Sequence, residues 1–193
     1  MTSELAKRVA VAAIGIPVAI VLLYIGGWPL ALVIAAVAAG GALELYRMAA
    51  VHGTAPFNVV GAVVAALFVL LAQASALHRA DWSWGLLMAA TLLVAALAIW
   101  RRGVDGRPLA ATATTVLGAV FVGGALSHAV ALRGLGNDPT WSGAGSIVGT
   151  ATGGAILLAM PFALTWFGDT FAYFGGRAWG RRKLIPSVSP GKT

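Results

Sequence analysis

The chain contains no cysteine, and only 10% of its 193 residues are charged. The absence of cysteine excludes disulfide bonds and metal sites built on thiolates. An ordinary soluble domain has about 25% charged residues, far more than this chain. With 60% hydrophobic residues and a mean hydropathy of +0.90, the shortage of charge indicates a protein that lies in a membrane.

Histidine and acidic residues are also scarce. His52, His78 and His128 are isolated and show no spacing typical of a metal site, so polar positions near helix ends or in helix interfaces are favoured for them. The chain has only 6 acidic residues, compared with 13 lysines and arginines. The distribution of these basic residues is more informative than the net charge of +7.

Apolar segments of about 17 to 25 residues are long enough to span a bilayer. The sequence contains six, approximately at Val9–Ile25, Leu30–Ala50, Val59–Leu77, Trp84–Trp100, Leu109–Leu132 and Ile147–Phe174. The sixth is expected either to run past the bilayer or to break near Gly168. Short connections with turn residues separate the segments. We therefore predict an all-α polytopic membrane protein in which residues 1–193 form a single transmembrane domain.

The basic residues predict the orientation, because lysine and arginine accumulate in cytoplasmic loops. A cytoplasmic N-terminus and six spans place all but two of the 13 basic residues on the cytoplasmic side. The exceptions, Arg79 and Arg133, fall in outer loops near Asp81 and Asp138. Both termini are therefore expected in the cytoplasm. A cleaved signal peptide is disfavoured, because another apolar segment follows the first at once and no small-residue cleavage site separates them.

Two acidic residues lie within apolar sequence. Glu44 precedes Arg47 by three residues, so an ion pair near the membrane surface is favoured over a catalytic role. Asp169 lies deep in the apolar stretch LTWFGDTFAYFGGR, where an ionisable residue is a candidate for function. Tyr173 shares its helical face, and the tyrosine hydroxyl could orient the carboxylate. A carboxylate that caps a broken helix, or pairs with a distant arginine, is the alternative.

The chain closes on SVSPGKT, which ends like a P-loop but does not fit one. The pattern G-x-x-x-x-G-K-[ST] requires glycine where Pro186 stands, and Pro190 lacks a backbone N–H. Ser189, Lys192 and Thr193 around Gly191 nevertheless offer groups that suit the oxygens of a polyphosphate. An anchor for anionic lipid headgroups would explain the basic residues before them, but not this ordered glycine, proline and serine.

The stretch GDTFAYFGGRAWGRRKLIPSVSPGKT resembles the central segment of the bacterial phosphatidate cytidylyltransferases, or CDP-diacylglycerol synthases. Members of that family read like D-T-x-A-Y-x-x-G-[RK]-x-x-G-[RK]-x-K-L-x-P-x-[IV]-S-P-G-K-T-x-E-G. The matching positions are Asp169, Thr170, Ala172, Tyr173, Gly176, Arg177, Gly180, Arg181, Lys183, Leu184, Pro186 and Ser189 to Thr193. The start of the chain is also similar, with Ile-Pro in the first span and E-x-[YF] at the end of the second, whereas the middle spans are generic.

This resemblance implies a multi-pass enzyme of the bacterial inner membrane that transfers the cytidylyl group of CTP to phosphatidic acid. CDP-diacylglycerol and pyrophosphate would be the products. The resemblance implies Mg²⁺ as cofactor, catalytic roles for Asp169 and Lys192, and Asp169 as one conceivable metal ligand. The substrate-binding candidates are Tyr173, Arg177, Arg181, Lys183, Ser189, Gly191, Lys192 and Thr193. CTP, phosphatidic acid and membrane lipids are the implied partners, without nucleic acid, and a homodimer is left open.

One part of the family pattern is absent. The C-terminal signature S-x-x-K-R-x₄-K-D-x-G-x₂-[LIF]-P-x-H-G-G-x-x-D-R-x-D, expected to supply the main metal ligands, does not occur before Thr193. The chain thus resembles the N-terminal two-thirds of a family member, and residues 1–193 are expected to be inactive alone. Turnover of CTP with phosphatidic acid by these residues would contradict this expectation.

Two other functions stay open. A related membrane enzyme that uses CTP on a lipid alcohol, such as a polyprenol or phytol kinase, would release a lipid monophosphate. A transporter or scaffold would need polar residues along a path through the membrane. The first five spans offer only scattered ones, namely Glu44, Gln73, Ser127 and His128.

Overall fold

The computed structural model describes residues 2–78, 82–135, 150–180 and 183 of the chain. Within these residues all regular structure is helical. The elements are α1 (Thr2–Ile25), α2 (Gly27–Val51), α3 (Asn58–His78), α4 (Ser83–Arg102), α5 (Pro108–Ala119), the π-helical turn η1 (Val120–Gly124), α6 (Ala125–Leu135) and α8 (Thr150–Trp179).

In the described part of the chain, five helical segments are long and apolar enough to cross a membrane: Gly27–Val51, Asn58–Ser75, Ser83–Arg102, Pro108–Leu135 and Thr152–Trp179. A shorter apolar segment, Val9–Ile25, lies within α1. The chain is therefore an all-α polytopic membrane protein, as its composition predicts.

The sixth predicted span does not break near Gly168. Helix α8 continues through this glycine and through Pro161, and it has 30 residues in all. Such a helix is about 45 Å long, whereas the hydrocarbon core of a bilayer is about 30 Å thick. The other sequence-based alternative, a helix that runs past the bilayer, is the one that the structure supports.

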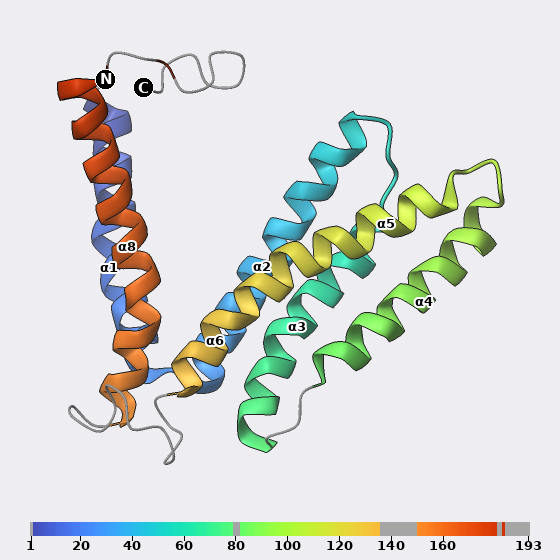
Figure 1. The fold of residues 1–193 in the computed structure, drawn as a ribbon, viewed down its shortest axis with the longest axis horizontal. Coiled ribbons are helices and arrows are strands. Elements are labelled where there is room, and N and C mark those ends of the chain that lie inside the picture. The colour runs from blue at the N-terminus through green and yellow to red at the C-terminus, as the bar shows by residue number, and fades with distance from the viewer. Residues whose placement is uncertain (1, 79–81, 136–149, 181–182, 184–193) are drawn as a thin grey trace.

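Helices α2 to α6 lie side by side as a bundle, whereas α1 and α8 form a pair at its edge (Figure 1). The pair meets the bundle where α1 is followed by α2 and where α6 contacts α8. The start of α1 and the end of α8 lie at the same end of the pair (Figure 1). The basic last turn of α8 is therefore on the same side of the membrane as the N-terminus.

A stripe of small residues forms the buried face of α2. Its members recur every three or four positions: Ala31, Ala35, Ala38 and Ala42. Large hydrophobic residues of the same helix, such as Leu32 and Val37, are exposed. Lipid tails are as apolar as leucine, so membrane helices associate through close packing of small residues. The large residues are consequently left for the lipid, and the alanines bring the helices together.

Gly123 allows α3 and η1 to touch backbone to backbone. A Cβ atom at this position would collide with the carbonyl oxygen and the Cα of Ala65. Just beyond, the carbonyl oxygen of Gly124 accepts a hydrogen bond of 2.7 Å from Ser127 Oγ and lies 2.8 Å from His128 Nδ1. Two polar residues of an apolar span are thus engaged within their own helix. The ring of His128 is exposed there, whereas the sequence predicts a place near a helix end or in a helix interface.

Tyr46 joins three helices at the end of α2. Its buried side chain donates a hydrogen bond of 2.6 Å to the carbonyl oxygen of Thr115 in α5. The Thr115 hydroxyl accepts a bond of 2.9 Å from the backbone N–H of Phe57, just before α3. Gly61 and Gly118 leave the space that the tyrosine ring occupies, since a Cβ at either position would overlap it. This network fixes α2, α3 and α5 on one side of the membrane.

The sequence predicts Arg133 in an outer loop near Asp138, but the structure places it elsewhere. It belongs to α6 and is buried, with 4% of its surface exposed. Its Nε donates to the carbonyl oxygen of Leu23 at 2.8 Å, and its Nη2 donates to that of Tyr24 at 2.6 Å. The last carbonyls of a helix carry partial negative charge and lack helical partners, so a cation is favoured there. Arg133 therefore ties the end of α1 to the bundle, while Asp138 is outside the described residues.

Candidate functional site

Three polar side chains follow one face of α8, and we call Asp169, Tyr173 and Arg177 the α8 polar stripe. They are spaced four residues apart, so each lies one turn beyond the last. The helix rises about 12 Å from the first to the third. Because Arg177 is in the last turn of a helix longer than the bilayer is thick, the stripe leads from the apolar part of α8 toward its polar end.

Tyr173 is hydrogen bonded to Arg177 and not to Asp169. Arg177 Nη1 donates to the tyrosine hydroxyl oxygen at 3.1 Å. The long arginine side chain reaches back by one turn, because side chains of a helix point toward its N-terminus. The sequence-based interpretation, in which the Tyr173 hydroxyl orients the Asp169 carboxylate, is therefore replaced by a tyrosine that holds a guanidinium group.

Asp169 is exposed on α8 and is not covered by any described part of the chain. Aromatic side chains surround it in the sequence and are exposed as well, among them Phe167, Phe171 and Phe174. The rings of Phe167 and Phe171 lie 6.4 Å apart. The carboxylate therefore does not cap a broken helix. An acidic group on an apolar, membrane-spanning surface is costly and marks a candidate functional residue.

The expected ion pair between Glu44 and Arg47 is not formed, although both residues are described and both are exposed. An exposed pair of this spacing stabilises a helix by only about 0.2–0.5 kcal/mol. Its absence therefore has little consequence for the fold. Both residues belong to α2, and Asp169 is the acidic residue of the α8 polar stripe.

The other predicted site residues are mostly beyond the described part of the chain. Lys183 is described and exposed. The remainder lie outside it, namely Arg181, Ser189, Gly191, Lys192 and Thr193. The structure thus brings Tyr173 and Arg177 together on the helix that carries Asp169, and their contact with the phosphate-binding candidates stays a prediction.

A metal site is not assembled by the described residues. Among them, no three histidine, cysteine or acidic side chains lie close enough to hold a metal ion. Mg²⁺ is commonly bound by one or two carboxylates together with substrate phosphates. Asp169 could supply one such carboxylate, but it does not make a metal site by itself.

The sequence does not indicate the roles that two residues of the described region have, Tyr46 and Arg133. Tyr46 falls in the E-x-[YF] pattern, yet nothing in the sequence indicates its bond to Thr115 in α5. The charge of Arg133 interrupts an apolar run and so indicates a loop, although the residue lies in α6. A long-range contact between residues separated by 109 positions leaves no local pattern in a single sequence.

Comparisons with known proteins show the family of the chain. The model of the cytidylyltransferase family matches residues 6–193, and the chain belongs to this family. A phosphatidate cytidylyltransferase from Haemophilus influenzae is 58% identical over 40 residues, which cover 21% of this chain and 14% of that protein. One from Pseudomonas aeruginosa is 40% identical over 55 residues, which cover 28% and 20%.

An uncharacterized protein of Escherichia coli, YnbB, is 51% identical over 41 residues, which cover 21% of this chain and 14% of that protein. These curated relatives are matched over a fifth of their length or less. No solved structure matches the chain. Family membership therefore rests on the match over residues 6–193, and the short alignments add high local identity.

Proposed function

We propose that this protein takes part in the transfer of the cytidylyl group of CTP to phosphatidic acid, which forms CDP-diacylglycerol and pyrophosphate. The observation that carries the proposal is the α8 polar stripe, with Asp169 one turn from a Tyr173–Arg177 pair on a membrane-spanning helix. Membership of the cytidylyltransferase family supports it. A lipid substrate and a water-soluble nucleotide have to meet at such a membrane surface.

The proposed reaction is a displacement at phosphorus without any redox step. A phosphate oxygen of the lipid forms a bond to the α-phosphorus of CTP, and the bond from that phosphorus to the α,β-bridging oxygen breaks. Pyrophosphate leaves with the bonding electron pair. Such a step depends mainly on positioning and on stabilisation of charge.

The described residues suggest roles in this reaction. Arg177 presents a planar set of N–H donors that suits phosphate oxygens, and the hydroxyl of Tyr173 holds one of its nitrogens in place. Asp169 contributes the negative charge at the apolar end of the stripe. Lys183, Arg181, Ser189, Gly191, Lys192 and Thr193 remain proposed phosphate contacts. Mg²⁺ remains a proposed requirement, and the described residues do not by themselves form its site.

Product analysis tests the proposed reaction. Membranes that contain the product of the complete gene are incubated with CTP, Mg²⁺ and phosphatidic acid, and lipids are identified by mass spectrometry. We expect CDP-diacylglycerol that depends on both substrates. A lipid monophosphate formed from an added polyprenol or phytol would instead support a CTP-dependent lipid kinase. The absence of any CTP-dependent lipid product would contradict both enzymatic assignments.

We further propose that the N-terminus and the end of α8 face the cytoplasm of a bacterial cell, in its inner membrane, where CTP is available. The absence of cysteine makes single introduced cysteines informative. Val104→Cys in the loop after α4 should react with a membrane-impermeant maleimide only after lysis. Trp82→Cys at the start of α4 should react in intact spheroplasts. Labelling in the reverse pattern would contradict the orientation. A homodimer remains open.

A further inference from the structure

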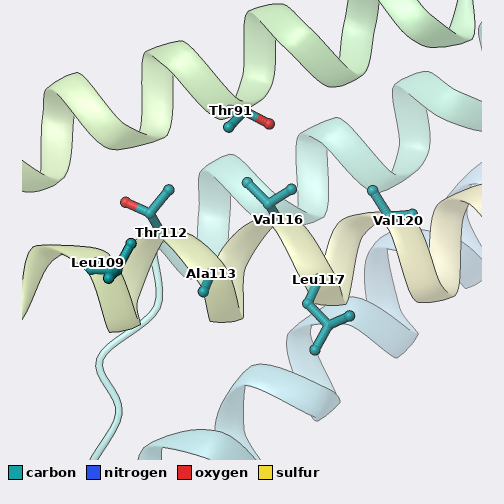
Figure 2. Close-up of a pocket in the computed structure, with 7 residues that line it drawn as sticks. All are labelled: Thr91, Leu109, Thr112, Ala113, Val116, Leu117 and Val120. Carbon is teal, nitrogen blue, oxygen red and sulfur yellow. The ribbon is translucent and has the colours of Figure 1, made fainter.

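A groove with a volume of about 440 Å³ lies between α4 and α5. Thr91 lines it from α4, and the other lining residues follow one face of α5 and the first position of η1 (Figure 2): Leu109, Thr112, Ala113, Val116, Leu117 and Val120. We call this feature the α4–α5 groove. The hydroxyl of Thr91 donates to the Leu87 carbonyl, and that of Thr112 to the Pro108 carbonyl. The groove therefore offers an apolar surface to a ligand.

The length of the α4–α5 groove matches one leaflet of a bilayer. Its ends at Leu109 and Val120 are 11 positions apart (120 − 109), which corresponds to about 16 Å of helix. Half of a hydrocarbon core about 30 Å thick is close to this value. Leu109 is 82% exposed and is the second residue of a membrane-spanning segment. The groove thus begins near the membrane surface and ends near the middle of the bilayer.

Positive charge gathers where the groove opens. Residues 101–107 contain three arginines and one aspartate, which gives a local net charge of +2 (3 − 1). Arg102 is engaged, since its guanidinium carbon lies 4.4 Å from the centre of the Phe57 ring. Arg101 and Arg107 are exposed, as is the single acidic residue of the loop, Asp105. The N-terminus of α5 adds partial positive charge at the same place.

The neighbouring residues place this loop at the membrane surface. Trp100, just before Arg101, is 87% exposed, and tryptophan is enriched at the level of the lipid headgroups. Clusters of basic residues next to a membrane span attract anionic lipids, at about 1 kcal/mol for each residue near the surface. The basic loop at the level of the lipid headgroups therefore leads directly into the apolar α4–α5 groove, which is about one leaflet long.

We propose that the α4–α5 hairpin binds one anionic phospholipid, with its headgroup against Arg101 and Arg107 and one acyl chain in the α4–α5 groove. A second copy of the chain is disfavoured as the occupant, because a two-fold contact in one membrane would bring two +2 loops together. The hairpin lies on the side of the bundle away from the α1–α8 pair (Figure 1). The site is therefore separate from the α8 polar stripe and does not depend on the proposed reaction.

Native mass spectrometry of the purified protein in detergent tests this site by titration with phosphatidylglycerol, phosphatidate and phosphatidylcholine. We expect one phosphatidylglycerol to be retained, with at least about 10-fold weaker binding of phosphatidylcholine. Phosphatidate should occupy the groove with an affinity similar to that of phosphatidylglycerol, apart from any binding as the proposed substrate. Arg101→Gln with Arg107→Gln should weaken phosphatidylglycerol binding about 30-fold. Ala113→Phe, which fills the groove, should weaken binding of all three lipids at this site about 15-fold or more by excluding two or three methylene groups.

Two matched variants act as controls. Ala89→Phe adds the same ring to an exposed position of α4 outside the groove, and Arg47→Gln removes an exposed arginine of α2. Both should keep affinities within about 2-fold of the wild type.

The proposal is overturned if Ala113→Phe acts no more strongly than Ala89→Phe, if phosphatidylcholine binds as well as phosphatidylglycerol, or if phosphatidate alone is retained. Loss of a dimer mass in Ala113→Phe, without loss of lipid, would assign the groove to a second copy. If Ala113→Phe lowers thermal stability, the double variant Arg101→Gln with Arg107→Gln still tests the proposal independently, through its effect on phosphatidylglycerol binding.

Discussion

Replacement of Asp169 by asparagine is expected to lower the rate of CDP-diacylglycerol formation by a factor of about 100 or more. The change keeps the size of the side chain and removes its charge. Asp169 is exposed on α8, so folding and membrane insertion should not change. The effect should appear in kcat, measured in membranes that contain the product of the complete gene, because the carboxylate is proposed to act on the reacting groups.

A suitable control for Asp169→Asn is Thr165→Val, one turn earlier on the same face of α8. The Thr165 hydroxyl donates to the Pro161 carbonyl within the helix at 2.8 Å, so its loss should leave kcat within about 2-fold. Expression and melting temperature should be equal for the two variants. A kcat for Asp169→Asn above about one third of the wild-type value would remove Asp169 from the catalytic residues.

The membrane-spanning helices could be predicted from the sequence because their signal is local. A bilayer demands a minimum apolar length, and the turn residues between the apolar segments mark their limits. For the same reason the sequence left two alternatives at Gly168, because a glycine inside an apolar segment does not show whether the helix continues. The 30 residues of α8 show that it does.

The packing of these helices could not be predicted in the same way. Hydrophobicity is high on every face of a membrane helix, so it does not show that Ala35 is buried while Leu32 is exposed. The contacts of Tyr46 with Thr115, and of Arg133 with Tyr24, join positions that are far apart in the chain. A single sequence carries no periodic pattern for such contacts.

The candidate site was predicted in part, because the residues of the α8 polar stripe belong to one contiguous motif. Helical spacing alone places Asp169, Tyr173 and Arg177 on one face. The choice of hydrogen-bond partner for Tyr173 depends on the length and direction of the neighbouring side chains, and the structure assigns it to Arg177. The spacing was equally compatible with Asp169, so the pattern could not decide between them.

Gly123→Ala is expected to destabilise the bundle by about 2 kcal/mol or more, which is at the upper part of the range for overpacking. The added methyl group would meet the carbonyl oxygen and Cα of Ala65. Backbone atoms of a membrane-spanning helix cannot move aside as a flexible side chain can, so α3 and η1 would have to separate. The separation would also disturb the small-residue packing that holds membrane helices together. Thermal unfolding of the purified protein in detergent measures the loss.

The adjacent glycine separates this effect from helix propensity. A Cβ at Gly124 would lie 3.7 Å from Val120 Cγ1, an ordinary van der Waals distance. Gly124→Ala should therefore be neutral or raise stability, by up to about 1 kcal/mol, because alanine favours a helix more than glycine does. Equal destabilisation by the two changes would show that the π-helical turn itself requires glycine. Loss of stability in Gly123→Ala alone would show that the absent side chain at Gly123 sets the distance between η1 and α3.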